Sequence, residues 1–292
     1  MAIERWGQNG IVGLRYIEWT TPGTYTWDVP PELQQGGVVE IDGAAGGGGG
    51  GGGFSLGGGG GGGSGCEWCE NLRLFIPVGA AQLTIVVGAG GAGGAGGGTP
   101  AAGSNGAATE VKYGATSLLY LNPGKGGSPG QAALPGNGAA AYSPTSWPGG
   151  VGAANANGGE ANLTNAFKAN FTDAKWNRGQ IYPGMVGGAG TYATSGSFRS
   201  SRLVNIFHNQ FNIVTPSSYT HTATDTGLGG ASGPGYVLKN VGGAVEPYQS
   251  SFLAPQARGA LFYGWGGRGG RAAGSLGYAG EDGAGGFLRL VY

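Results

Sequence analysis

Charged side chains are scarce in this chain. They make up 10% of its 292 residues, and 15 Lys and Arg balance 15 Asp and Glu, so the formal net charge is zero. A protein without excess positive charge has no general attraction to nucleic acid or to anionic lipid. We therefore expect no nucleic-acid partner and no binding to a charged membrane surface.

Cysteine and histidine are almost absent, with two residues of each kind. Cys66 and Cys69 lie in a CEWC motif, and such a pair can be a redox centre or half of a zinc site. No second CxxC occurs, and the two histidines, His208 and His221, lie far away in the sequence. We expect no metal ion and no cofactor; ordinary loop thiols and a local disulfide both stay open for the pair.

The motifs of common enzyme classes are missing as well. There is no G-x-S-x-G elbow and no HExxH, and GKGGSPG at 124–130 lacks the Ser or Thr that follows Lys in a phosphate-binding loop. Convergent carboxylates of the glycosidase kind stay open as an alternative. They would come from Glu67, Glu70, Asp225, Glu246, Glu281 and Asp282. With so few acids, we expect a protein that is not an enzyme.

No apolar run is long enough to span a membrane. The longest, over 72–87, is interrupted by residues such as Arg73 and Pro77 and falls short of a membrane helix. The first ten residues, MAIERWGQNG, lack the basic region and apolar stretch of a secretory signal. We expect no membrane insertion and a protein that is made in a cytoplasm.

Glycine is abundant, with 71 residues against a usual share of roughly 7%. Such an excess is typical of disordered chains, which also tend to carry a high net charge. Here the net charge is zero, while hydrophobic residues make up 39% and aromatic residues 10% of the chain. The composition therefore favours an ordered fold that uses glycine as a packing element.

Several short segments alternate apolar and polar residues, the pattern of half-buried strands. In TYTWDV, for example, Tyr25, Trp27 and Val29 share one face. The short gap between the segments 71–78 and 82–87 predicts a hairpin. The predicted strands are 24–29, 38–42, 71–78, 82–87, 109–113, 117–121 and 287–292.

Two glycine-rich stretches instead repeat every third residue. Ala89, Ala92 and Ala95 recur in this way within 88–98, and Trp265, Arg268 and Arg271 do so within 264–274. A polyproline-II helix has three residues per turn, so each trio lines one edge and leaves two edges of glycine. These stretches predict polyglycine-type helices that pack side by side through backbone hydrogen bonds.

The middle of the chain differs from its two ends. Residues 160–228 hold few glycines and many aromatic side chains, which predicts an ordinary inserted subdomain. Thr164 is a candidate cap for a short helix that ends near Trp176, whereas 202–214 fits a strand or a helix. The predicted division is a docking segment at 1–16, a glycine-rich β domain at 17–159, the insertion at 160–228 and the rest of the β domain at 229–292.

The order of these pieces resembles the glycine-rich domain of phage tail-fibre, tail-tip and minor tail proteins. The resemblance lies in YTWDVPPE, VVEIDGAAGGGGGGGG, LTIVVGAGGAGG and GEDGAGGFLRLVY and covers roughly 18–130 and 260–292. It implies a virion protein in or near the adsorption apparatus, often oligomeric and with a trimer as the family expectation. It also implies polyglycine helices packed between loops that touch the host.

The edge formed by Trp265, Arg268 and Arg271 is the sharpest candidate site. An indole beside two guanidinium groups suits stacking on sugar rings and bidentate contacts with phosphates or carboxylates. The alternative is structural: Trp265 packs in the scaffold while the arginines donate to glycine carbonyls. Loops of mixed Tyr, Ser and Asn composition add candidates for glycan binding, namely Tyr142, Trp147 and Tyr219.

Taken together, the sequence predicts an all-β fold: a small β-sandwich or jelly-roll-like scaffold with packed polyglycine-type helices and long glycine-rich loops. The expected function is a phage tail-tip or tail-fibre protein that contacts a bacterial surface glycan or another outer-surface receptor. Its segment 1–16 would dock to other tail proteins. The alternatives are a purely architectural head-decoration or tail-assembly protein and, less favoured, an ice-binding polyglycine protein.

Overall fold

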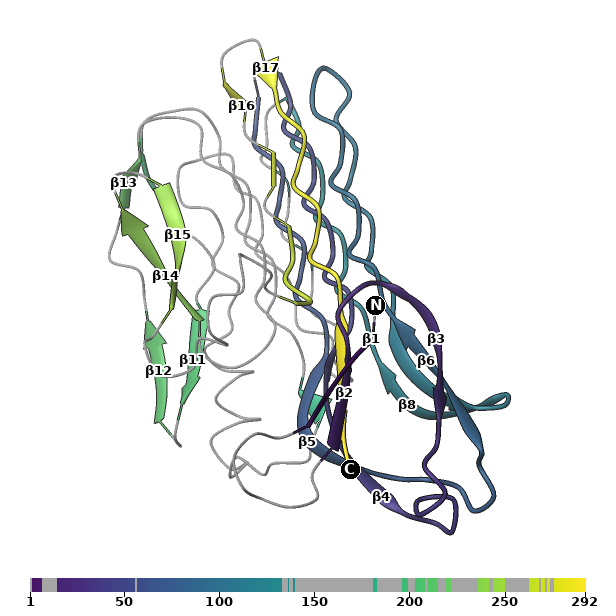
Figure 1. The fold of residues 1–292 in the computed structure, drawn as a ribbon. Helices are drawn as coiled ribbons and strands as arrows, with labels where there is room; N and C mark the ends of the chain where they lie inside the picture. The colour runs from purple at the N-terminus through teal and green to yellow at the C-terminus, as the bar shows by residue number, and fades with distance from the viewer. Residues whose placement is uncertain are drawn as a thin grey trace.

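A computed structural model describes the two ends of the chain and short pieces between them. The described residues are 2–6, 15–55, 57–132, 136, 139, 181–182, 196–198, 203–207, 210–214, 219–221, 236–241, 244–249, 263–267, 269–270, 272–273 and 276–292. Over these residues the fold is all-β, and they contain no α-helix. Two antiparallel sheets lie at one end of the molecule with the C-terminus, and long glycine-rich segments extend away from them (Figure 1).

The larger sheet has six strands in the order β1-β2-β18-β4-β5-β9, all antiparallel. The last strand of the chain, β18, lies between β2 and β4, so the C-terminus is fixed inside the sheet. The bounds are β1 (Ala2–Trp6), β2 (Arg15–Trp19), β18 (Phe287–Val291), β4 (Val38–Ala44), β5 (Trp68–Phe75) and β9 (Ile181–Tyr182).

The second sheet has four strands in the order β3-β6-β7-β8. Its bounds are β3 (Gly23–Asp28), β6 (Gln82–Val87), β7 (Thr109–Tyr113) and β8 (Thr116–Leu121). The alternating patterns therefore predicted seven strands of the two sheets to within a few residues, at 24–29, 38–42, 71–78, 82–87, 109–113, 117–121 and 287–292. They did not predict β1, β2 or β9 of the larger sheet. Within β3, Trp27 is buried and its neighbours Thr26 and Asp28 are exposed, as the period of two requires.

Further strands form two-stranded antiparallel pairs. The segment 202–214, for which strand and helix were both open, forms the pair β11 (Leu203–Phe207) and β12 (Gln210–Val214). The predicted helix after Thr164 lies outside the described residues, and the domain boundaries stay predictions. The other pairs are β10 (Gly196–Phe198) with β13 (Tyr219–His221), β14 (Tyr236–Val241) with β15 (Ala244–Gln249), and β16 (Ala272–Ala273) with β17 (Leu276–Gly277).

The predicted hairpin between 71–78 and 82–87 is wrong. β5 belongs to the six-stranded sheet and β6 to the four-stranded sheet, so the connection between them crosses from one sheet to the other. Leu74 on β5 and Leu83 on β6 are both buried in one apolar cluster. A short turn can therefore connect strands of two different sheets as well as the strands of a hairpin, and the spacing in the sequence does not distinguish these cases.

One hydrophobic cluster joins both sheets. Ile41 and Leu288 of the larger sheet and Ile85 of the smaller one are fully buried in it. Burial of an aliphatic side chain of this size contributes about 1.5–3 kcal/mol. Aromatic contacts join the sheets too, because the rings of Trp27 and Tyr292 lie 5.5 Å apart, centroid to centroid. The core therefore holds the sheets together at the base of the molecule.

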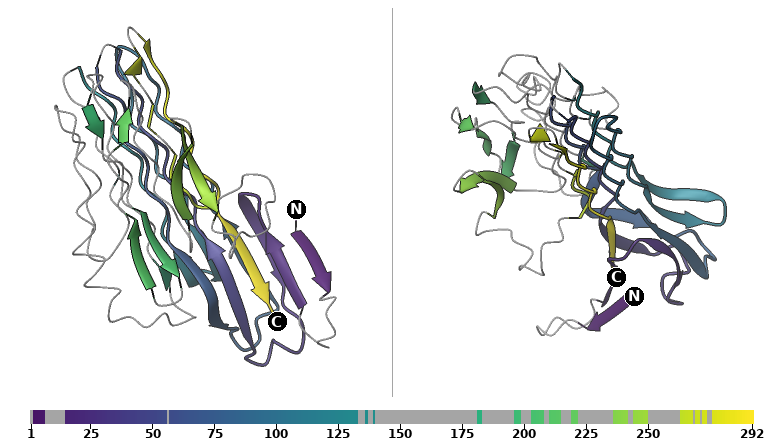
Figure 2. Two further views of the ribbon diagram at one scale, coloured as in Figure 1. Left: turned by 90° about the vertical axis from the view of Figure 1, so that its left-hand side faces the viewer. Right: turned by 90° about the horizontal axis from the view of Figure 1, so that it is seen from above.

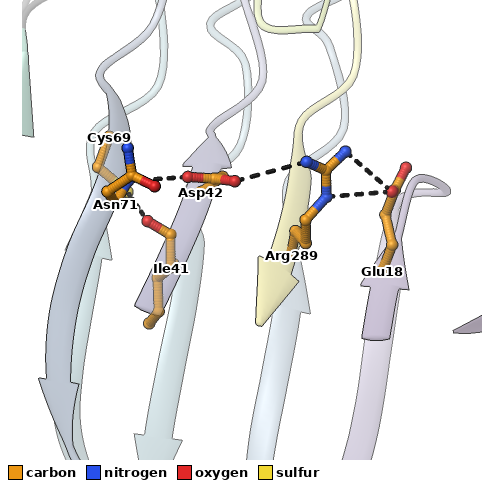
Figure 3. A network of polar contacts seen from close by, with 6 residues as sticks. All are labelled: Glu18, Ile41, Asp42, Cys69, Asn71 and Arg289. Atoms are coloured by element: carbon orange, nitrogen blue, oxygen red, sulfur yellow. Dashed lines mark hydrogen bonds and ion pairs between the residues drawn. The ribbon is translucent and has the colours of Figure 1, made fainter. Parts of the chain in front are cut away.

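A polar ladder crosses four strands of the larger sheet (Figure 3). The guanidinium of Arg289 on β18 lies 3.2 Å from the Glu18 carboxylate on β2 and 3.5 Å from the Asp42 carboxylate on β4. Asp42 also accepts the backbone N–H of Asn71 on β5 at 2.8 Å. Exposed ion pairs of this kind contribute little, typically below about 1 kcal/mol, so the ladder favours one register more than it adds stability.

The strands continue directly into extended glycine-rich segments. These are 46–53, 57–65, 88–97, 101–107, 124–131, 264–270 and 278–286, and we call them together the glycine array. Figure 2 shows them running side by side from the sheets to a far end that carries β16 and β17. Because the chain passes from sheet to array and back, the strands set where each segment begins.

Thr109 lies at the junction between the sheets and the array. Its buried hydroxyl donates to the carbonyl oxygen of Ala44 at 2.9 Å and accepts the N–H of Gly88 at 3.1 Å. Both backbone groups belong to points where a strand becomes a glycine segment. The hydroxyl thus satisfies polar groups that would be costly to bury unpaired.

We expect Thr109→Val, which keeps the side-chain shape, to lower the free energy of unfolding by about 2 kcal/mol or more, because it leaves two buried backbone groups without this partner. Chemical denaturation followed by tryptophan fluorescence measures the loss. The matched control is Thr116→Val at an exposed position, with an expected change within about 0.5 kcal/mol. Equal effects of the two substitutions would contradict the assigned role of Thr109.

Candidate functional site

The segment 46–53 lies at the centre of the glycine array. Its backbone N–H groups donate in turn to three different segments, and the sequence of partners repeats every third residue. Gly46 donates to Ala107, Gly47 to Ala284 and Gly48 to Ser64, at 2.9–3.0 Å. Gly49, Gly50 and Gly51 repeat the series with Ser104, Glu281 and Gly61. Every donor along the central segment through Gly53 is thus satisfied inside the array.

The carbonyl groups of the central segment face three further neighbours. Gly91 donates to the carbonyl of Gly47, Gly124 to that of Gly46 and Gly267 to that of Gly48, at 2.7–2.8 Å. The six surrounding segments also bond to one another, each to the next. The central segment is therefore enclosed by a closed ring, which consists of 57–65, 124–131, 101–107, 88–97, 278–286 and 264–270.

Side chains are excluded from much of the central segment. A Cβ atom added to Gly46, Gly49 or Gly52 would meet the carbonyl oxygen of Ala89, Ala92 or Ala95, which belong to one neighbour. A Cβ at Gly47 or Gly48 would meet the carbonyl of Trp265 or of Lys125 on two other neighbours. The obstacles are backbone atoms that cannot rotate away. Glycine is thus a steric requirement of enclosure at these positions.

The outer segments place their side chains on the outside. Ala89, Ala92 and Ala95 are exposed, while Gly88, Gly91 and Gly94 between them are buried. Segment 101–107 likewise exposes Ala101, Ser104 and Ala107. The recurrence of alanine at every third residue thus coincides with the solvent-facing edge, where a methyl group meets no backbone.

Polar side chains replace backbone partners at the margin of the array. The Asp282 carboxylate accepts the backbone N–H of Gly93 at 2.8 Å, and the side-chain amide oxygen of Asn105 accepts the backbone N–H of Gly126 at 3.0 Å. Near the sheets, the buried Glu67 carboxylate accepts both the backbone and the amide N–H of Asn122, at 2.9 and 2.8 Å. These contacts make the array a cross-linked support along its whole length.

The far end of the array carries five residues that we call the array tip. Thr99, Gln131, Leu276 and Tyr278 are exposed and Phe54 is half-buried. Backbone contacts bring them together, since Gly53 donates to the Tyr278 carbonyl, Gly58 donates to that of Gln131, and Phe54 pairs with Gly97 in a bridge. Leu276 is 58% exposed and Tyr278 41%. An aromatic ring and an aliphatic chain thus stand in solvent on a rigid support, a geometry suited to binding.

Of the predicted site residues, Trp265 is fully described. It is half-buried and packs against the core cluster, and its carbonyl accepts the N–H of Ala284. Arg268, Arg271, Tyr142 and Trp147 lie outside the described residues, and Tyr219 is described through its backbone in β13 alone. The other five candidates therefore stay predictions.

Sequence reasoning missed the array tip. Leu276 and Tyr278 follow a stretch of period-three glycine repeats, and their only signal is that they interrupt it with large side chains. That signal is weak, because Trp265 interrupts the same kind of repeat and is packed against the core. The difference lies in the distance from the sheets, which the sequence pattern does not encode.

The two cysteines are buried thiols and form no disulfide. Cys66 donates its backbone N–H to Gly264, and the Cys69 thiol faces the Ile41 carbonyl, with 3.8 Å between sulfur and oxygen. Burial, reinforced by the nearby Asp42 carboxylate, raises the pKa of Cys69 from 9.0 to about 12. Cys69 is therefore a protonated, unreactive thiol at neutral pH, contrary to what redox chemistry needs.

Two further findings on the described residues concern metal binding and membrane spanning. They contain no group of three or more His, Cys, Asp or Glu side chains placed to hold a metal ion. Nor do they include a helix with the length and hydropathy needed to cross a membrane. The array tip is therefore the candidate site that the described part of the chain offers.

Residues 20–292 match a family model described as a glycine-rich domain. No curated protein matches the chain. The family match spans the four-stranded sheet, the larger sheet apart from β1 and β2, and the whole array.

We expect Gly49→Ala to abolish folding or to lower the free energy of unfolding by about 3 kcal/mol or more, because its methyl group would collide with the backbone of Ala92. The control is Gly98→Ala, since a Cβ there meets nothing within 4 Å. Circular dichroism during urea denaturation compares the two. A Gly49→Ala protein with the wild-type midpoint would refute the close packing around the central segment.

The pKa of Cys69 predicts how stability changes in alkali. The unfolded thiol ionises near pH 9.0 and the folded thiol near pH 12. The contribution of this thiol to the free energy of unfolding is thus complete below pH 9. It is lost as the pH rises towards 12, at about 1.4 kcal/mol per pH unit. Denaturation midpoints of wild type and Cys69→Ala between pH 8 and 11 should diverge, with the steeper decline in wild type. Parallel pH profiles would rule the shift out.

Proposed function

The chain belongs to the glycine-rich domain family, and from that premise we propose that it is a structural and adhesive protein of a tailed-phage particle, in its tail tip or tail fibre. The observation that carries the proposal is the array tip, where Leu276 and Tyr278 are exposed at the end of a fully cross-linked support. Such a protein is made in the host cytoplasm and acts on the virion.

The array segments adopt polyproline-II-type helices in this proposal, and the two sheets form a small sandwich beneath them. Support for the helices comes from the hydrogen bonds of 46–53. Successive N–H groups donate to three different neighbouring segments in turn, and the same segment recurs at every third residue. Three residues per turn is the repeat of polyproline II. The single core cluster drawn from both sheets supports a sandwich.

An adhesin needs a recognition surface that stays in place under load. In the array, the recognition surface is held by backbone hydrogen bonds between segments that are far apart in sequence, such as Gly53 with Tyr278 and Gly52 with Ala101. Loosening one segment therefore requires breaking bonds to several neighbours. A support of this kind limits the ordering entropy that its tip loses when it binds.

The ligand that we propose is a bacterial surface glycan or another outer-surface receptor. The Tyr278 ring and the Leu276 side chain suit the apolar face of a sugar, because aromatic rings combine apolar area with a polar group. The C-terminus and the sheets lie at the other end of the molecule (Figure 1), where segment 1–16 would attach to other tail proteins. A homo-oligomer, with a trimer as the family expectation, would multiply the tips.

An architectural virion protein without receptor binding is the alternative. It is favoured by the exposed Phe75 and Val78 at the sheet end, which suit a contact with a neighbouring virion protein. An ice-binding protein is the less favoured alternative. Its motivation is the exposed row of Ala89, Ala92 and Ala95, and a measurement of thermal hysteresis tests it.

The test is binding of the purified protein to intact candidate host cells. We expect saturable binding that weakens at least tenfold, or by about 1.4 kcal/mol, when Leu276→Ser and Tyr278→Ser are combined. Both side chains stand in solvent, so folding should persist. The control pair, Tyr113→Ser with Tyr120→Ser, removes exposed tyrosines from β7 and β8 and should leave binding unchanged.

Other outcomes separate the rival hypotheses. Binding that survives the tip substitutions but is lost in Arg268→Ala with Arg271→Ala would move the site to the predicted arginine edge. No binding to a host that the parent particle infects would overturn the adhesive function and support the architectural alternative.

A further inference from the structure

Among the described residues, no strand lies along one edge of the second half of β5 in the larger sheet. Ile76 donates its backbone N–H to the Gly37 carbonyl, and the register pairs Leu74 with Val39. Because residues of an antiparallel strand alternate in the direction of their backbone groups, the N–H and C=O of Arg73 and Phe75 point away from β4. On that side β9 pairs with Trp68 and Cys69 alone. Among the described residues, no strand pairs with Arg73 or Phe75 there.

The side chains beside this edge are also exposed. Phe75 is 70% exposed and Val78 73%, and Val38, the cross-strand neighbour of Phe75, is 41% exposed. Open strand edges and exposed apolar side chains are both features that soluble proteins normally avoid. Their coincidence at the sheet end of the molecule indicates a contact surface for an extended strand.

We propose that this edge pairs with the same edge of a second copy of the chain, in an antiparallel arrangement with a two-fold axis at Leu74. Arg73 of each copy then lies opposite Phe75 of the other. The two pairs supply four backbone hydrogen bonds, since each pair joins residues whose N–H and C=O both face outward.

The residues of the edge select this register among the possible ones. Placing Arg73 opposite Arg73 would bring like charges together, which destabilises a cross-strand pair. Placing Phe75 opposite Phe75 would bring Arg73 opposite Pro77, which has no N–H to donate. The remaining register sets each Arg73 guanidinium beside the Phe75 ring of the other copy, an attractive contact.

A second copy is the occupant that the edge itself favours. The paired segment is self-complementary in charge and hydrogen bonding, as a two-fold interface must be. The arrangement is two-fold and thus differs from the trimer that the family resemblance implies.

Sedimentation velocity of the full chain over a concentration series tests the pairing. We expect a monomer–dimer equilibrium in wild type. Phe75→Lys sets a cation opposite Arg73 and should weaken the dimer, whereas Phe75→Glu sets an anion there and should bind at least ten times more tightly than Phe75→Lys. The control Tyr120→Lys, at an exposed ring on the other sheet, should dimerise as wild type does.

Two results would overturn the proposal: a wild-type protein that stays monomeric at every concentration, or Lys and Glu at position 75 that weaken the dimer equally. A discrete trimer would likewise reject the two-fold arrangement. Circular dichroism of each variant confirms that the fold persists.

Disulfide trapping tests the register directly. Residues that face each other in a hydrogen-bonded antiparallel pair have Cα atoms about 5.5 Å apart, within the range of a disulfide. A mixture of Arg73→Cys and Phe75→Cys proteins should therefore cross-link under mild oxidation, and either protein alone should not. Wild type, with Cys66 and Cys69 buried, supplies the background. Efficient cross-linking of Arg73→Cys alone would refute the register.

Discussion

The backbone hydrogen bonds of the segment 46–53 are the constraint on which the rest of the structure depends. Each successive N–H of this segment faces a different neighbour, and each carbonyl accepts from another, so all six surrounding segments are tied to one central chain. The arrangement leaves no space for a Cβ atom at positions 46–49, 51 and 52 of the central segment. Glycine is commonly a residue of flexibility, yet here its lack of a side chain permits a backbone that is bonded on every side and therefore rigid.

The array depends in turn on the two sheets. Glycine loses more conformational entropy on folding than any other residue, and each backbone hydrogen bond contributes only about 0.5–1.5 kcal/mol net. Apolar burial is absent from the interior of the array, where there are no side chains. The sheets provide this apolar burial through residues such as Ile41, Ile85 and Leu288. The strands β4, β5, β6 and β18 also fix the ends of glycine segments that are far apart in the sequence. Thr109 and Glu67 lie where the strands join the glycine segments, and their side chains form hydrogen bonds with backbone groups at that junction.

Local periodicity carried most of what could be predicted. A period of two identified the strands because one face of each strand packs in the core, and a period of three located Ala89, Ala92 and Ala95 on an outer edge because inner positions exclude a methyl group. Pairing between strands was harder to predict. The segments around Leu74 and Leu83 looked like a hairpin because both have apolar faces and a short gap, but they face the same core from different sheets. The array tip was missed for a related reason. How far a residue lies from the sheets depends on how all seven segments align with one another, and the repeat within one segment does not show that alignment.

The two exposed surfaces of the described chain lie at opposite ends, and this bears on how they could act together. β5 begins next to the array at Trp68 and ends away from it at Phe75, whereas β17 lies at the far end of the glycine segments (Figure 1). A partner at the β5 edge therefore leaves the array tip accessible. Because β5 of each copy runs away from its own array, antiparallel pairing of the two strands directs the two arrays in opposite directions. Each tip of the dimer therefore faces a different side. The rigid array matters for each tip separately, because a rigid support limits the ordering entropy that the tip loses when it binds. The all-glycine core would then serve binding through stiffness, while recognition is left to the few side chains at the tip.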